Sequence, residues 1–115
     1  MSFLIRLFIT AAVAYGLSII LKGVHIPNFI DALILAVVLA LLNTFIKPIL
    51  VILTLPITII TMGLFLFVIN ALIILLADRL MDGIRIDGFW WAAIFSLILS
   101  VASSVVYSLV EKKSY

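Results

Sequence analysis

The chain has 115 residues, of which 68% are hydrophobic and 10% are charged, and its mean hydropathy is +1.54. Soluble domains carry roughly 45–50% apolar and about 25% charged residues, so this composition excludes an ordinary water-soluble fold and indicates a membrane protein. The net charge of +2 is spread over seven scattered Lys and Arg residues, which excludes a basic face for nucleic acid, and the absence of cysteine excludes disulfides and thiolate sites.

Four apolar stretches predict four membrane-spanning helices, because a hydrocarbon core of ~30 Å requires about 20 apolar residues in a helix. They run from Leu7 to Leu21, from Ala32 to about Val51, from Ile57 to Ala77 and from Phe89 to Val110. Continuous apolar runs lack the alternation that a transmembrane barrel needs. The predicted fold class is therefore an all-α integral membrane protein, a four-helix transmembrane bundle.

The segment 23–32 returns sixty positions later as the segment 83–92, with Gly, Ile, Phe and Ala in register. This match predicts a single transmembrane domain, residues 1–115, built from two tandem two-helix repeats at about residues 3–50 and 63–110. Each repeat holds an even number of spans, so both enter the membrane in the same direction. The repeats are therefore expected to be parallel, related by an axis along the membrane normal.

Two short segments inside the repeat, 23–26 and 83–86, alternate polar and apolar residues after a glycine. Both patterns are typical of extended strands, and both segments fall on the outer side of the predicted bundle. They are expected to pair as a β-ribbon with His25 and Arg85 facing water. The apolar residues between them are expected to face the helices.

Small residues recur every four positions along the second and fourth spans. Such stripes let helix backbones approach closely in lipid, where no hydrophobic force drives helices together. We expect the two helices to pack against each other through them; the alternative is that the serines line a water-filled path in an oligomer. The packing residues are Ala32, Ala36, Ala40 and Thr44, and Ala92, Ser96, Ser100 and Ser104.

Three polar residues lie within or beside apolar spans. Asn43 and Lys47 share a face near the inner end of the second span, and Asn70 lies deep in the third. Lys47 fits either an interfacial anchor or a site for lipid phosphate or a polar substrate. Asn70 fits either an interhelical hydrogen bond or a contact to a substrate or ion.

Two prolines shape the segment between the second and third spans. Pro48 is expected to kink the second helix, and Pro56 to lie in the first turn of the third. This connection is too apolar for a solvated loop. A re-entrant elbow and a tight turn between tilted helices both remain open.

The charges favour a topology with both termini in the cytoplasm. Arg6, Lys47, Lys112 and Lys113 would then lie inside, against Lys22, Arg79 and Arg85 outside. The outer loop 78–87 carries charges of both signs, which is typical of a solvated surface, so no metal site is expected.

The second and third spans contain the run Asn43-x-x-Ile46-Lys47-Pro48-Ile49-Leu50-x-x-x-Thr54-Leu55-Pro56-x-x-x-x-Thr61-x-Gly63-Leu64-Phe65-x-x-x-x-Asn70-Ala71. This run resembles the four-transmembrane phage holin superfamily, which includes many small chromosomal membrane proteins of bacteria. The resemblance implies an integral protein of the bacterial inner (cytoplasmic) membrane that oligomerises and permeabilises the membrane.

Three functions are compatible with the sequence. The first is a holin-like, membrane-permeabilising homo-oligomer. The second is a non-pore envelope scaffold or accessory protein with lipid or a larger membrane protein as partner, and the third is a small lipid- or solute-handling transporter that uses Asn43, Lys47 and Asn70. An enzyme is not expected, because no nucleophile and base pair, metal cluster or phosphate-binding glycine loop can be assembled, and no cofactor is expected.

Overall fold

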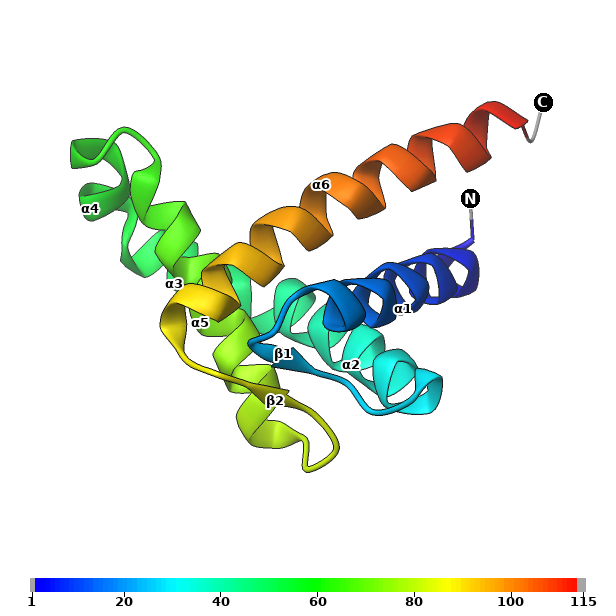
Figure 1. Ribbon diagram of the computed structural model, residues 1–115. Coiled ribbons are helices and arrows are strands. Elements are labelled where there is room, and N and C mark those ends of the chain that lie inside the picture. The colour runs from blue at the N-terminus through cyan, green and yellow to red at the C-terminus, as the bar shows by residue number, and fades with distance from the viewer. Residues whose placement is uncertain (1, 114–115) are drawn as a thin grey trace.

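Two helix pairs meet around a small β-ribbon (Figure 1). In the first pair α1 (Phe3–Ile20) packs against α2 (Phe29–Leu41), and in the second α5 (Leu64–Leu80) packs against α6 (Phe89–Lys113). α1 also packs on α6, and α2 meets α5. The computed structural model describes residues 2–113. In Figure 1 the start of α1 and the end of α6 lie toward the right, α4 lies at the upper left, and the ribbon lies below them.

Three helices in the described residues are long and apolar enough to cross a membrane: Phe3–Ile20, Phe29–Leu53 and Phe89–Val110. The second is a continuous rod made of α2, the π-helical turn η1 (Leu42–Ile46) and α3 (Lys47–Leu53). α5 has 17 residues and rises about 25 Å. The fold is thus mostly helical, with three to four apolar helices and a small ribbon.

The predicted third span, Ile57–Ala77, is wrong as a single helix. Its first part is the separate helix α4 (Leu55–Ile60), and a turn at residues 61–63 precedes α5. Met62 and Gly63 adopt left-handed φ values of 54° and 89°. The Gly63 N–H donates to the Thr58 carbonyl oxygen at 2.8 Å, which closes the end of α4. A residue with a side chain loses roughly 1–2 kcal/mol in the left-handed conformation, so a methionine is rarely found there. The sequence at Met62 therefore did not indicate a helix end.

The predicted ribbon is confirmed. Strand β1 (Val24–His25) pairs antiparallel with β2 (Arg85–Ile86), so that Val24 lies opposite Ile86 and His25 opposite Arg85. His25 and Arg85 are exposed. The apolar ribbon residues on both sides of them are buried: Val24, Ile26, Ile84 and Ile86.

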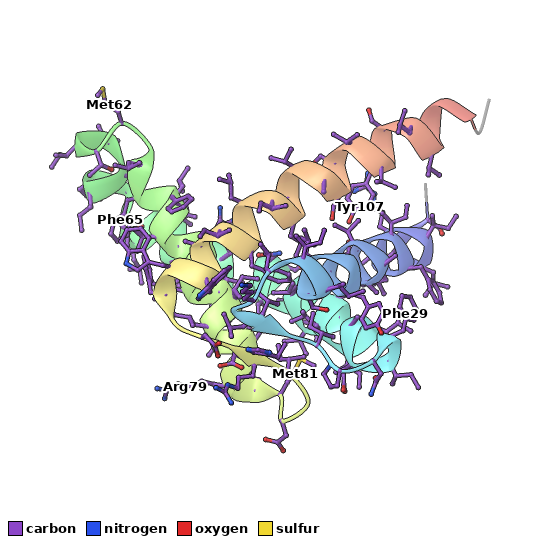
Figure 2. All side chains as sticks on the ribbon, in the orientation of Figure 1. Phe29, Met62, Phe65, Arg79, Met81 and Tyr107 are labelled. Carbon is purple, nitrogen blue, oxygen red and sulfur yellow. The ribbon has the colours of Figure 1, made fainter. Side chains whose placement is uncertain are left out.

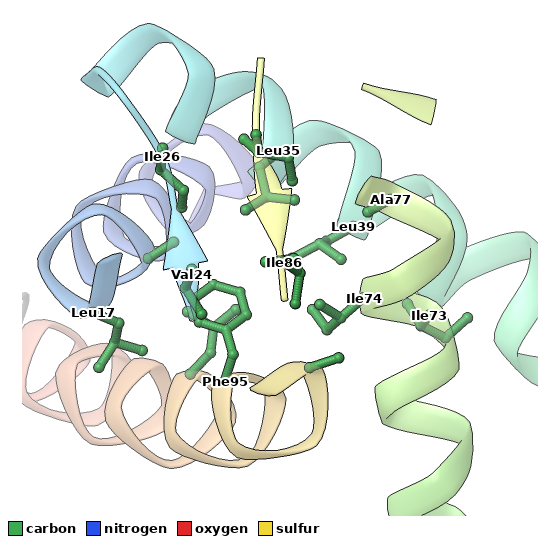
Figure 3. Close-up of a cluster of buried hydrophobic side chains, with 14 of the residues drawn as sticks. Leu17, Val24, Ile26, Leu35, Leu39, Ile73, Ile74, Ala77, Ile86 and Phe95 are labelled. Carbon is green, nitrogen blue, oxygen red and sulfur yellow. The ribbon is translucent and has the colours of Figure 1, made fainter. Parts of the chain in front are cut away.

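The hydrophobic core lies between the ribbon and the four long helices, as Figure 3 shows. Phe95 on α6 and Leu35 on α2 are completely buried, and Val24 is 1% exposed. In Figure 3 the Phe95 ring points from α6 toward Val24. The ribbon therefore covers the apolar side chains that the helices leave uncovered where they cross.

Gly23 is expected to be intolerant of a side chain. A Cβ at Gly23 would lie 2.1 Å from the Trp91 ring, whereas a Cβ at Gly16 would meet nothing within 4 Å. We expect Gly23→Ala to lower the free energy of unfolding by about 1–3 kcal/mol through overpacking. Gly16→Ala, inside α1, should raise it by about 0.5–1 kcal/mol. Unfolding of both variants in mixed micelles titrated with dodecyl sulfate measures the difference, and equal stabilities would contradict the packing of Trp91 on Gly23.

Candidate functional site

Three polar side chains from separate segments gather around one small cavity inside the bundle. Asn43 comes from η1, Lys47 from the first residue of α3 and Asn70 from α5. The cavity has a volume of about 60 Å³, and we call it the Lys47 cavity. Its other lining residues are Leu39, Ile73, Ile74, Ser96, Leu99 and Ser100. The structure thus brings together the three intramembrane polar residues that the sequence analysis selected.

Pro48 explains the local backbone of this site. A proline inside a helix has no N–H to donate and clashes with the carbonyl four residues earlier. The chain widens into η1, in which the Lys47 N–H donates to the Leu42 carbonyl oxygen five residues back. The Thr44 hydroxyl donates to the Ala40 carbonyl oxygen at 2.7 Å. The predicted disturbance at Pro48 is therefore a π-helical turn inside a continuous rod, and such turns are frequent at functional sites.

The polar groups of the Lys47 cavity are rich in hydrogen-bond donors. Among the side chains that the structure describes, an ammonium, two amides and two hydroxyls line it, and no carboxylate does. Within residues 2–113, the side chains of Asn43, Lys47 and Asn70 have no hydrogen bond or ion pair to protein. Lys47 and Asn70 are half-buried, whereas Asn43 is exposed. A half-buried ammonium beside amide donors favours an anionic ligand, because charge-assisted hydrogen bonds are the strongest that these groups can form.

A larger groove of about 360 Å³ adjoins the Lys47 cavity between α1, α2 and α6. The two share Leu39, Asn43, Leu99 and Ser100 as lining residues. We call it the Arg6 groove. Its remaining lining residues are Phe3, Arg6, Leu7, Thr10, Ala36, Ala40, Ser103, Ser104 and Tyr107.

A polar cluster joins α1 to α6 along the Arg6 groove. The Tyr107 hydroxyl hydrogen-bonds the Thr10 hydroxyl and donates to the Arg6 carbonyl oxygen at 3.4 Å. The Arg6 guanidinium carbon lies 5.3 Å from the centre of the Tyr107 ring. Figure 2 shows Tyr107 on the side of α6 that faces α1. Sequence reasoning missed this cluster, because Thr10 and Tyr107 are 97 positions apart and neither belongs to a repeated pattern.

Ser103 also lines this groove, and the sequence analysis did not select it. It is 5% exposed, and its hydroxyl has no hydrogen-bond partner among the described residues. By contrast, the Ser96 hydroxyl donates to the Ala93 carbonyl oxygen at 3.2 Å. A serine in a helix normally satisfies itself in this way. Ser103 therefore offers a buried donor to whatever occupies the groove.

The predicted packing of the second helix on the fourth is wrong. Over the described residues, α2 packs mainly against α1, and α6 packs against α5 and α1. The Arg6 groove and the Lys47 cavity lie between the later parts of α2 and α6. The physical reason is that α1 packs on both helices and lies between them in Figure 1. The small residues in the first halves of α2 and α6 are buried: Ala32, Ala36, Ala92 and Ser96. Farther along, Ala40 is half-buried and Thr44, Ser100 and Ser104 are exposed.

Pro56 lies in the first turn of a helix, as predicted, but that helix is the short α4. Thr54 precedes it as the N-cap residue, and its hydroxyl donates back to the Leu50 carbonyl oxygen at 2.7 Å. The apolar connection therefore consists of the end of the α2–η1–α3 rod followed by the separate short helix α4, and it is not a single tight turn.

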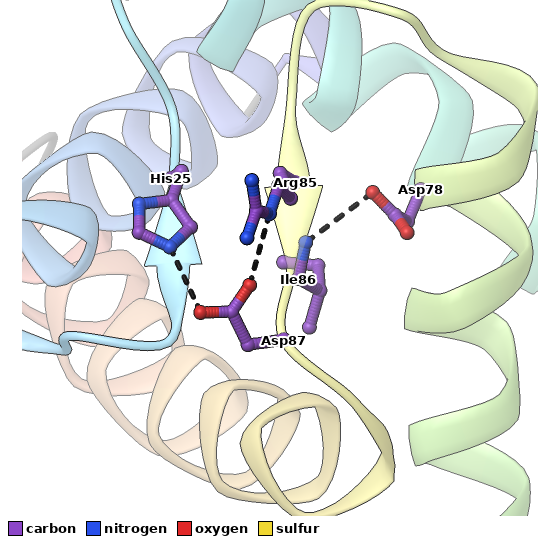
Figure 4. Close-up of polar contacts among 5 residues, drawn as sticks. All are labelled: His25, Asp78, Arg85, Ile86 and Asp87. Carbon is purple, nitrogen blue, oxygen red and sulfur yellow. Dashed lines mark hydrogen bonds and ion pairs between the residues drawn. The ribbon is translucent and has the colours of Figure 1, made fainter.

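At the opposite end, charged residues tie the two strands together (Figure 4). Asp87 accepts hydrogen bonds from His25 Nε2 at 3.0 Å and from Arg85 Nε at 3.1 Å. Asp78 Oδ1 accepts from the Ile86 N–H at 3.3 Å. The hydrogen bond from His25, and then that from Arg85, hold the pKa of Asp87 below its ordinary value of 3.8.

The low pKa of Asp87 predicts a small acid sensitivity of the ribbon. A carboxylate whose pKa is lowered by folding stabilises the folded state above its unfolded pKa, and this contribution is lost as the pH falls through the folded pKa. We expect wild type to be slightly more stable than Asp87→Asn at neutral pH, with the difference starting to shrink below about pH 4 and disappearing once the pH is below the folded pKa. Unfolding in micelles at several pH values measures it. A difference that persisted at low pH would show that Asp87 acts through packing.

Comparison with known proteins identifies the family. The sequence profile described as "Mycobacterial 4 TMS phage holin, superfamily IV" matches residues 1–105. The chain belongs to this family. The "Uncharacterized membrane protein YvlD" of Bacillus subtilis (strain 168) is 46% identical over 82 residues, which cover 70% of this chain and 69% of the relative. The "Uncharacterized protein SCO3922" of Streptomyces coelicolor is 44% identical over 75 residues, covering 62% and 60%.

No solved structure matches the chain. The family match confirms the resemblance carried by residues 43–71 and makes this a small multi-pass membrane protein of the four-span holin family. In that setting the Lys47 cavity and the Arg6 groove are polar sites between membrane helices. Polar side chains in such positions are costly in lipid, and they commonly mark binding sites and pathways.

Proposed function

We propose that this holin-family membrane protein binds the phosphate of an anionic lipid in the Lys47 cavity. The observation that carries the proposal is the convergence of Asn43, Lys47 and Asn70 on one cavity, whose lining contains no carboxylate from the described part of the chain. A phosphate oxygen accepts several hydrogen bonds at once, so it can satisfy the ammonium and the amides together. With both termini in the cytoplasm of a bacterium, Lys47 would lie near the inner leaflet, where anionic lipids give basic pockets between helices their ligands.

The proposal includes an internal duplication that relates residue n to residue n + 60. Its support is that His25 pairs with Arg85, its own repeat equivalent, as a twofold axis through the ribbon requires. Two glycines have neighbours that follow the same relation. Gly23 lies against Trp91, and its repeat equivalent Gly83 lies against Asp31, which is the repeat equivalent of Trp91. On this relation, Thr10 and Tyr107 in the groove correspond to Asn70 and Lys47 in the cavity.

The duplication sharpens the assignment of the ligand site. In the Arg6 groove the Thr10 and Tyr107 side chains hydrogen-bond each other directly. In the Lys47 cavity the equivalent Asn70 and Lys47 line the same space without a hydrogen bond between them. Thr10 and Tyr107 thus satisfy each other, whereas Asn70 and Lys47 have hydrogen-bond donors that still need an acceptor. A lipid phosphate supplies that acceptor.

The test is lipid binding measured by native mass spectrometry on protein released from micelles. We expect wild type to bind dioleoyl phosphatidylglycerol more tightly than dioleoyl phosphatidylcholine. Lys47→Gln should weaken phosphatidylglycerol binding about tenfold, since one charge-assisted hydrogen bond is worth roughly 1.5–3 kcal/mol. Lys22→Gln, at an exposed lysine beyond the end of α1, is the matched control and should bind as wild type does. Equal binding by Lys47→Gln and wild type would refute the proposal.

A second candidate is the holin-like activity, a pore formed by several copies. The observation that favours it is the exposure of Ser100, Ser104 and Ser108 on the part of α6 that projects from the bundle. Three hydroxyls on one exposed helix face could line water in an oligomer. Release of a trapped dye from liposomes by the purified protein tests this function, and an intact barrier at high protein-to-lipid ratio would exclude it.

A further inference from the structure

The proposed phosphate site opens directly into the Arg6 groove. Leu39, Asn43, Leu99 and Ser100 line both spaces, so a lipid whose phosphate lies in the Lys47 cavity has the groove beside it. The cavity has a volume of about 60 Å³ and the groove one of about 360 Å³. The groove is therefore the larger space within reach of the rest of the bound lipid.

One buried polar group in the groove has a hydrogen bond to give. The Ser103 side chain is 5% exposed, and its hydroxyl has no hydrogen-bond partner among the described residues. Ser103 lines the groove and not the Lys47 cavity. A buried hydroxyl without a partner is costly, so its position favours a ligand that carries an acceptor there.

Ser103 lies deeper in the membrane than the phosphate site. On the repeat relation, Lys47 is equivalent to Tyr107, and Ser103 is one helical turn, about 6 Å, nearer the ribbon than Tyr107. The ribbon lies at the opposite end of the span, so this displacement is toward the middle of the membrane. In a glycerophospholipid the ester carbonyls also lie deeper than the phosphate, where the acyl chains begin.

The groove continues past Ser103 with an apolar lining. Leu99 is one turn nearer the ribbon on α6, and Ala36 and Leu39 of α2 line the same space. Methylene groups can pack against these side chains. The order of the lining is therefore that of a lipid: a donor for the phosphate, a donor for a carbonyl, and then apolar surface.

We propose that the bound lipid is an ester-linked glycerophospholipid. Its phosphate binds Lys47 and Asn70, one ester carbonyl accepts a hydrogen bond from the Ser103 hydroxyl, and the acyl chain of that ester begins along the Arg6 groove. This inference rests on the proposed function and deepens it, since it names the linkage by which the site recognises its lipid.

The experiment compares three probes on the full-length protein by native mass spectrometry: dioleoyl phosphatidylglycerol, its diether analogue with octadecenyl chains, and inorganic phosphate. The two lipids have the same phosphate and the same chain length, but the diether has no ester carbonyl. Wild type should bind the diester about fivefold more tightly, the effect of one neutral hydrogen bond. Inorganic phosphate should bind far more weakly than either lipid. Equal binding of the two lipids, or equally tight binding of inorganic phosphate, would overturn the inference.

Variants separate this inference from the proposed function. Ser103→Ala should bind both lipids equally, whereas Ser108→Ala, at an exposed serine of α6, is the matched control and should keep the preference for the diester. Lys47→Gln should weaken both lipids and keep the preference. A preference that survived Ser103→Ala would overturn the carbonyl contact and leave the phosphate site intact. If Lys47→Gln affected neither lipid, the proposed function itself would fail.

The folding of Ser103→Ala does not limit this test. The variant removes only an unpartnered hydroxyl, so it should be as stable as wild type. The comparison of the two lipids on wild type also decides the matter without any variant.

A phosphatidylglycerol with a diazirine near the carboxyl end of one chain tests the path of that chain. On wild type it should crosslink to the groove residues Leu39 and Leu99, and Lys47→Gln should reduce these crosslinks. Ile34 and Val37 are exposed on α2 outside the groove lining, so they are the control positions. Crosslinks confined to Ile34 and Val37 would overturn the placement of the chain in the groove.

Discussion

Replacing Phe95 by alanine is expected to destabilise the protein more than any other single truncation in the core. Phe95 is the largest side chain that is completely buried, and it points from α6 toward the ribbon (Figure 3). Phe→Ala substitutions in soluble cores cost about 3–5 kcal/mol, a value that includes the transfer of the ring to water. In lipid the ring of the unfolded protein stays in an apolar medium, so the transfer term is absent. The loss of stability then comes only from the cavity and from the lost dispersion contacts. We therefore expect a loss of about 2–3 kcal/mol.

Phe45→Ala is the matched control for this prediction. The Phe45 side chain is 63% exposed on η1, so its truncation leaves no cavity. Titration with dodecyl sulfate in mixed micelles should show an earlier unfolding midpoint for Phe95→Ala and an unchanged one for Phe45→Ala. Coincident curves for Phe95→Ala and wild type would mean that the ribbon and α6 do not form a packed core.

The elements that the sequence predicted correctly depend on local patterns. The pairing of the two strands followed from a glycine, an alternation of polar and apolar residues and a second copy of the same pattern. The first residue of α6 is Phe89, as predicted, because the charged outer loop ends abruptly before an apolar run. Pro48 and Pro56 lie where the backbone changes, since each removes an N–H that a regular helix would use.

The relative placement of the helices could not be predicted from local sequence patterns. The small-residue stripes on α2 and α6 did not specify the partner of either helix, and α1 and α5 are the neighbours instead. Which helix fills a groove depends on crossing angles, and in lipid a stripe of small residues fits any helix that can approach it. The break at Met62 was invisible for a different reason, because a methionine rarely adopts a left-handed conformation.

The candidate site was predicted only in part. Asn43, Lys47 and Asn70 were conspicuous because each is polar in apolar surroundings, and the structure places them around one cavity. Ser103 resembled its neighbours in the serine-rich fourth span, and only its burial without a hydrogen bond distinguishes it. Tyr107 belongs to the site because it hydrogen-bonds Thr10, which lies on a helix at the other end of the chain. No local pattern indicates this contact.

The second large effect is expected at Ala11, where α1 packs against its neighbours. Ala11 is completely buried, whereas the adjacent Ala12 is exposed. Ala11→Leu forces three additional carbon atoms into a filled space and should cost about 1–3 kcal/mol, because overpacking displaces side chains and backbone. Ala12→Leu adds the same atoms on the lipid-facing side, where a leucine is as apolar as the lipid tails, and should be neutral.

Dodecyl sulfate titration of the two variants measures this contrast, and lipid binding extends it to function. α1 supplies one wall of the Arg6 groove and no residue of the Lys47 cavity, so a displaced α1 in Ala11→Leu should leave phosphatidylglycerol binding at the Lys47 cavity unchanged. Equal stability of Ala11→Leu and Ala12→Leu would mean that lipid reaches both faces of α1. The groove could not then exist as an enclosed site, whereas the Lys47 cavity, built from η1, α3, α5 and α6 together with Leu39 of α2, could persist without it.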